Sequence, residues 1–77
     1  MNKNDYRLEI YKAMIQYLLE STSYTLSDIA ELSDSSIKNI QSIYCNDLMP
    51  ADFSSESHLI KLYHFVLELK INEKRFY

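Results

Sequence analysis

The sequence predicts an all-α fold, a compact domain of four to five helices in which the second and third helices form a helix-turn-helix. Three observations support this prediction. Glycine is absent from the 77 residues and Pro50 is the single proline, so few residues interrupt helices. No segment alternates apolar and polar residues as a half-buried strand does. Apolar residues instead recur every three or four positions along most of the chain.

The length and composition indicate one globular domain over residues 1–77, because 47% of the residues are hydrophobic and 25% charged. Cys45 is the only cysteine, and no Cys/His cluster has metal-ligand spacing, so we expect a bacterial cytoplasmic protein without metal or cofactor. The first residues lack the apolar core of a secretion signal, and no stretch approaches the roughly 20 apolar residues that span a bilayer. We therefore expect neither secretion nor membrane insertion.

The first helix is predicted from Asp5 to about Ser21, with two apolar stripes. One stripe consists of Leu8, Tyr11, Ile15 and Leu18, and the neighbouring one of Tyr6, Ile10, Met14 and Tyr17. One buried face needs a single stripe, so this helix has more apolar surface than the fold requires.

The second helix is predicted from Leu26 to about Leu32. Thr25 is suited to cap it, with Asp28 completing a capping box in place of the usual glutamate. We expect Ile29 and Leu32 to face inward. Residues 33–35 then form a turn.

The third helix follows Ser36, which is placed to cap it, and runs to about Cys45. Its inward residues are Ile40 and Ile43. Residues 46–53 form a loop in which Asn46 is the expected left-handed cap.

Ser54 or Ser55 is predicted to start the last helix, which is apolar nearly all round. One stripe consists of Leu59, Leu62, Val66 and Leu69, and the other of Ile60, Tyr63, Leu67 and Ile71. A small domain cannot cover such a helix on every side, so we expect a homodimer. The predicted interface residues are Tyr63, Leu67 and Ile71, with Phe76 or Tyr77; the alternative is that the first helix buries them.

Residues 29–36 have the sequence Ile-Ala-Glu-Leu-Ser-Asp-Ser-Ser, and Ile40 and Ile43 follow three residues apart. This pattern resembles the lambda-repressor/Cro (Xre) helix-turn-helix family, in which a similar run precedes a capping serine and a recognition helix with two spaced aliphatics. Pro50 and residues 59–66 resemble the proline and closing helix that follow in that family. The resemblance covers about residues 15–66 and implies a DNA-binding transcriptional regulator that acts as a homodimer.

The resemblance also implies that the outward side of the third helix contacts double-stranded DNA. The implied DNA-binding residues are Ser36, Ile37, Lys38, Asn39, Gln41 and Ser42. Gln41 would pair with an adenine edge, Ile37 would touch a thymine methyl, and Lys38 would meet a phosphate or guanine. Ser36 and Asn39 lie at the helix N-terminus, where backbone amides hold phosphates.

Other features favour an alternative function. Leucines stand at positions 19 and 26, where the family commonly has Arg and Gln that support DNA docking, and Asp34 replaces the turn glycine. Tyr63 replaces a small residue, and the formal net charge is −3. These departures favour an acidic protein-interaction module, an adaptor, anti-repressor or co-regulator, that binds another transcription protein and not DNA. Lys38 and Gln41 would then belong to a solvated helix face. An antitoxin combining both roles is a third possibility.

No residue pattern predicts an enzyme. His58 and His64 lie six residues apart, about 600° around a helix, and so do not share a face. Cys45 has no cationic neighbour to activate it, and the carboxylates are explained as caps.

Overall fold

The computed structural model describes residues 6–51 and 53–74. This part of the chain forms four α-helices and contains no strand, which confirms the all-α prediction. The helices are α1 (Tyr6–Ser21), α2 (Leu26–Leu32), α3 (Ile37–Asn46) and α4 (Glu56–Lys74). Asp5, Phe76 and Tyr77, which entered the predictions above, lie outside the described residues.

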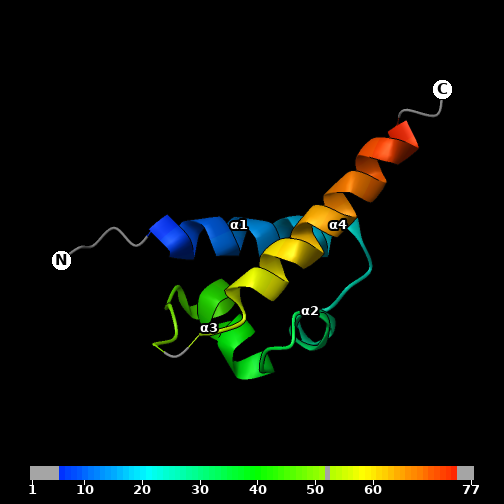
Figure 1. Ribbon diagram of the computed structural model, residues 1–77. Coiled ribbons are helices and arrows are strands. Elements are labelled where there is room, and N and C mark those ends of the chain that lie inside the picture. Colours follow the sequence, from blue (N-terminus) through cyan, green and yellow to red (C-terminus); the bar gives the residue numbers. More distant parts are fainter. Residues whose placement is uncertain (1–5, 52, 75–77) are drawn as a thin grey trace.

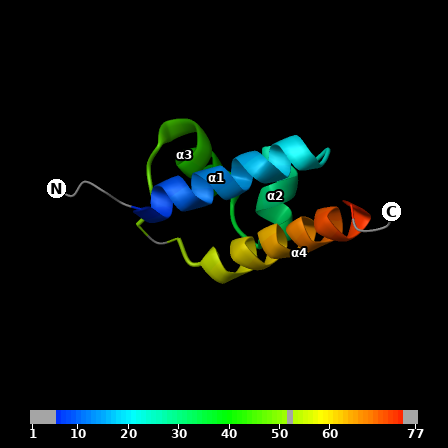
Figure 2. The ribbon, with the colours of Figure 1, turned by 90° about the horizontal axis from the view of Figure 1, so that it is seen from above.

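The other three helices are arranged around α1 (Figure 1). In that view α2 and α3 lie below α1, and α4 crosses in front of it. Seen from above, α1 and α4 run side by side (Figure 2). The C-terminal turns of α4 extend beyond the other helices, so they have fewer neighbours to pack against.

The core lies between α1, the helix-turn-helix and the first half of α4. Its buried apolar residues are Tyr11, Ile15, Leu18, Ile29, Ala30, Ile40, Ile43, Phe53, Leu59 and Val66. The predicted inward residues of the third helix, Ile40 and Ile43, are both fully buried. The first predicted stripe of α1 is likewise its buried face, with Leu8 half-buried.

Two details differ from the sequence prediction, and a third residue, Leu69, is more exposed than the rest of its predicted stripe. Leu32 is 51% exposed, because the buried side of α2 is centred on Ile29, Ala30 and Ser33, and Leu32 lies about 100° from Ser33. Leu69 is 47% exposed, since it belongs to the turns of α4 that extend past the other helices. The left-handed cap of α3 is Asp47, with φ 54°, and not Asn46, which is the last helical residue.

Two ion pairs join α1 to distant parts of the chain. Arg7 Nη1 of α1 lies 3.0 Å from Glu56 Oε2 in the first turn of α4. Lys12 of α1 pairs with Asp47 at the C-terminal end of α3. Together they connect α1 to both ends of the segment that follows the helix-turn-helix. Among the described helices, none has an apolar run long enough to cross a membrane.

The predicted capping box of α2 is confirmed. The Thr25 hydroxyl accepts from the Asp28 amide at 3.1 Å, and the Asp28 carboxylate accepts from the Thr25 amide at 2.9 Å. These bonds satisfy two amides that the first turn of a helix leaves without partners.

We predict that Thr25→Ala lowers the free energy of unfolding by about 1 kcal/mol, because it removes the cap acceptor. Urea denaturation followed by circular dichroism would measure the loss. Ser23→Ala is the matched control, since Ser23 is exposed and precedes the helix. Equal stability of Thr25→Ala and Ser23→Ala would contradict a role for the cap.

Candidate nucleic-acid interface

The predicted helix-turn-helix spans residues 25–47 and consists of the cap Thr25, α2, residues 33–36, α3 and the cap Asp47. Ile29 and Ala30 of α2 and Ile40 and Ile43 of α3 are buried together in the core. Ala30 is 3% exposed, and its small side chain allows the two helices to approach each other closely. The helix pair therefore packs against α1 and α4, and the opposite side of α3 is open to solvent.

The turn between the helices forms without glycine. Asp34 adopts φ 57°, a left-handed conformation that aspartate tolerates better than most residues. The Ser35 amide donates to the Ala30 carbonyl at 2.8 Å, which closes the turn. The buried Ser33 hydroxyl donates to the Ile29 carbonyl at 2.7 Å and hydrogen-bonds the Ser35 hydroxyl at 2.8 Å. Ser33, Asp34 and Ser35 thus form a turn in which a glycine is not needed.

A hydrogen bond that the sequence does not predict links this turn to α4. The Ser55 hydroxyl donates to the Asp34 carbonyl at 2.8 Å, while the Ser55 carbonyl accepts the first helical bond of α4, from Leu59. The two partners are 21 residues apart, so no local pattern indicates the contact. It fixes the start of α4 against the helix-turn-helix.

The outward side of α3 carries Lys38, Gln41 and Cys45, all exposed. They lie opposite Ile40 and Ile43 around the helix, as the 100° turn per residue requires. Within the part of the chain that the structure describes, the side chains of Lys38 and Gln41 make no hydrogen bond or ion pair. They are available to a ligand.

The other four predicted contact residues differ in how accessible they are. Ile37 is 39% exposed on the edge of this face. Ser36 is exposed and caps α3, its hydroxyl accepting from the Asn39 amide at 3.1 Å. Asn39 is half-buried. Ser42 is half-buried and donates to the Leu48 carbonyl at 2.7 Å, so its hydroxyl already holds the loop after α3.

The charge of the chain is concentrated in the helix-turn-helix. Between positions 25 and 47 there is one cation, Lys38, and four carboxylates, a formal charge of −3. The seven cations and seven carboxylates elsewhere in the chain cancel. Asp28 is occupied in the capping box and Asp47 pairs with Lys12, whereas Glu31 and Asp34 are exposed.

Two leucines stand where the resemblance predicts polar residues that dock on DNA, and both belong to the edge of the core. Leu19 and Leu26 are half-buried and pack against the buried residues. Their side chains therefore contribute to packing, and the usual polar contacts to a DNA backbone are missing at these positions.

The predicted dimer residues on α4 have three different environments. Tyr63 is half-buried, and its ring meets that of Tyr17 edge-on with centroids 5.4 Å apart. Leu67 is half-buried, and Ile71 is 46% exposed. The contact with Tyr17 therefore holds the large side chain of Tyr63 against α1.

Three comparisons with known proteins give no match. The chain matches no protein-family model, no curated protein and no solved structure. Over residues 6–51 and 53–74 there is also no pocket and no group of three or more His, Cys, Asp or Glu residues that could hold a metal ion. His58, His64 and Cys45 are each exposed.

Proposed function

We propose that the protein is a small, bacterial, cytoplasmic DNA-binding regulator of transcription that acts as a homodimer and inserts α3 into the major groove. The observation that carries this proposal is the division of α3 into two faces. Ile40 and Ile43 hold the helix in the core, and Lys38 and Gln41 face solvent without partners among the described residues. A rigid helix with a free polar face is the geometry that a helix-turn-helix uses to read base edges.

The side chains on that face have the chemistry for a short contact with DNA. A glutamine amide both donates and accepts, so Gln41 can pair with the N6 and N7 positions of adenine. Ile37 lies at the edge of the face, where an apolar side chain can touch a thymine methyl. Lys38 can neutralise a phosphate or donate to guanine. Ser42, which is bonded to Leu48, is the weakest candidate of the six predicted residues.

The test is a gel shift at low salt with DNA from upstream of the gene's own operon. The double variant Lys38→Ala with Gln41→Ala should lose the shift, while its stability changes by about 0.5 kcal/mol or less, because both side chains are exposed. Gln16→Ala is the control, because it removes the same exposed amide side chain from α1, outside α3, and should bind normally. Absence of a shift with the folded wild-type protein would refute the proposal.

The charge distribution favours a second candidate, a protein-interaction module that does not bind DNA. Phosphate neutralisation supplies much of the affinity for DNA, and a helix-turn-helix with charge −3 opposes it. Exposed Glu31 and Leu32 on α2 and Ile37 on α3 instead offer acidic and apolar contacts to a transcription protein. A single protein partner that is retained after nuclease treatment, together with a negative gel shift, would favour this candidate.

A further inference from the structure

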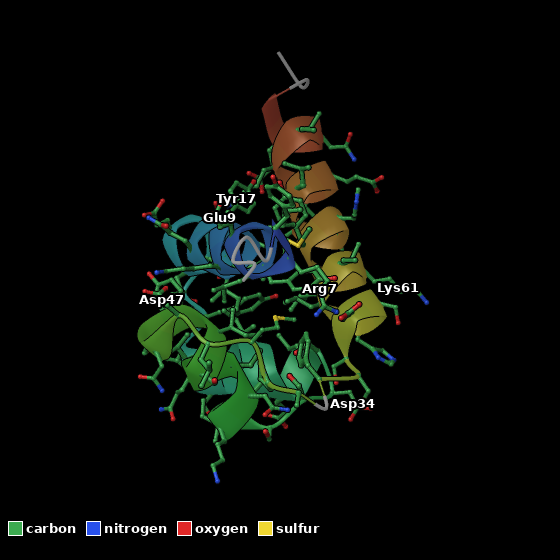
Figure 3. The ribbon with its side chains drawn as sticks, turned by 90° about the vertical axis from the view of Figure 1, so that its left-hand side faces the viewer. Arg7, Glu9, Tyr17, Asp34, Asp47 and Lys61 are labelled. Atoms are coloured by element: carbon green, nitrogen blue, oxygen red, sulfur yellow. The ribbon has the colours of Figure 1, made fainter. Side chains whose placement is uncertain are left out.

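The second apolar stripe of α1 faces away from the helix-turn-helix. Tyr6 is 70% and Ile10 50% exposed, and Tyr17 is half-buried on the same side. In Figure 3, Tyr17 lies at the top of α1, whereas the ribbon of α3 and Asp34 lie below α1. The core residues of α1 face α2 and α3, so Tyr6 and Ile10 are turned toward solvent, whereas Met14 and Tyr17 of the same stripe are half-buried at the edge of the core.

The stripe continues from α1 onto α4. The edge-on contact between Tyr17 and Tyr63 connects the two helices, and Leu67 and Ile71 follow Tyr63 at intervals of four residues. We call these six residues the α1–α4 stripe: Tyr6, Ile10, Tyr17, Tyr63, Leu67 and Ile71. The stripe contains all three predicted dimer residues of α4 and extends the predicted dimer interface onto α1.

We propose that a second copy of the chain docks on the α1–α4 stripe, so that the two copies stand back to back. The exposed fractions of Tyr6, Ile10 and Ile71 correspond to roughly 300 Å² of surface, similar to the largest apolar patch of a typical monomer, which is often functional. The half-buried residues of the stripe add further area to this surface. A stable dimer buries roughly 800 Å² per partner.

Charge indicates how the second copy is placed. Exposed Glu9 and Glu20 lie along one flank of the stripe on α1. Placing α1 on α1 of the second copy would bring these acidic flanks together, which is unfavourable. The exposed flank of α4 carries Lys61 and His64 as well as Glu68, so it is not uniformly acidic. We therefore place α1 of one copy on α4 of the other.

This arrangement determines where the two α3 helices point. A two-fold axis lies in the plane of contact, so it turns the side bearing the stripe toward the partner and the opposite side outward. Because α3 lies opposite the stripe, the outward faces of the two α3 helices point in opposite directions. They cannot enter successive major grooves, about 34 Å apart, on one side of a duplex. The second part of the inference is therefore that one dimer holds two separate duplex segments. This part rests on the proposed function.

The pairing is tested without DNA, by light scattering of the full chain after size exclusion over a range of concentrations. The wild-type mass should correspond to two chains, and Ile10→Asp should halve it while the circular dichroism spectrum is retained. Phe65→Asp is the control, because Phe65 is 59% exposed on α4 outside the stripe and should leave the dimer intact. A monomeric wild type, or dissociation by Phe65→Asp and not by Ile10→Asp, would overturn the proposal.

The orientation is tested with DNA, by asking whether beads that carry one duplex retain a second, labelled duplex through the protein. The wild type should retain it, and Ile10→Asp should bind duplex in a gel shift yet retain none on the beads. A dimer that binds DNA without retaining a second duplex would refute the back-to-back arrangement. If no variant binds DNA, the proposed function fails while the light-scattering result stands, so the two failures are distinguishable.

Discussion

Ile40→Ala should lower the free energy of unfolding by about 2 to 5 kcal/mol, a larger loss than we expect from truncating any exposed side chain of α3. Ile40 is fully buried and contributes to the core that α3 shares with α1 and α2. Truncation removes its buried methyl and methylene groups and leaves a cavity that the surrounding helices fill only in part. A domain of 77 residues has a small margin of stability, so a loss of this size leaves much of the protein unfolded.

Ile37→Ala is the matched control, because it removes the same atoms from the same helix at a position that is 39% exposed. We expect a loss of about 1 kcal/mol or less, since solvent replaces the missing contacts. Urea denaturation would compare the two variants, provided that the slope of the free energy of unfolding against urea concentration is the same for both. Equal losses would mean that the buried and exposed faces of α3 have been assigned incorrectly.

The features of the fold that the sequence predicts are those set by local spacing. The capping box of Thr25 and Asp28 depends on residues three apart, and its partners are those that the sequence indicates. The burial of Ile40 and Ile43 follows from helical periodicity in the same way. For the same reason the division of α3 into a buried and a polar face could be predicted before its neighbours were known.

The features that the sequence does not predict depend on contacts between distant residues. Leu32 is exposed because the small Ser33 occupies the core beside Ile29. Which of these side chains is buried depends on how α2 packs against its neighbours. The ion pair of Lys12 with Asp47 joins residues 35 positions apart. Likewise, the direction of the α1–α4 stripe relative to α3 follows from how the helices pack together. Helical periodicity predicts which side chains share a face of one helix, but it does not predict which other helix that face contacts.

The turn of the helix-turn-helix gives the second large effect. Asp34→Val should lower the free energy of unfolding by about 1 to 3 kcal/mol, because a β-branched residue is strained at φ 57°. Asp34→Gly should instead raise it, by up to about 1 kcal/mol, since glycine adopts this conformation without a steric penalty. Both substitutions remove the same negative charge, so the difference between them reports the backbone conformation alone. Thermal melts that coincide would show that position 34 is not held in the left-handed region.

The glycine variant also bears on function. Asp34 is one of four carboxylates in the helix-turn-helix and one of the two exposed ones that make no ion pair or capping bond within the described residues. Replacing it with glycine keeps the turn, retains the carbonyl that accepts from Ser55, and reduces the charge of the segment from −3 to −2. If α3 docks on DNA, the loss of this repulsion should tighten binding in the gel shift. Tighter binding by the glycine variant would show that the acidic turn opposes DNA binding, and unchanged binding would place that turn away from the phosphates.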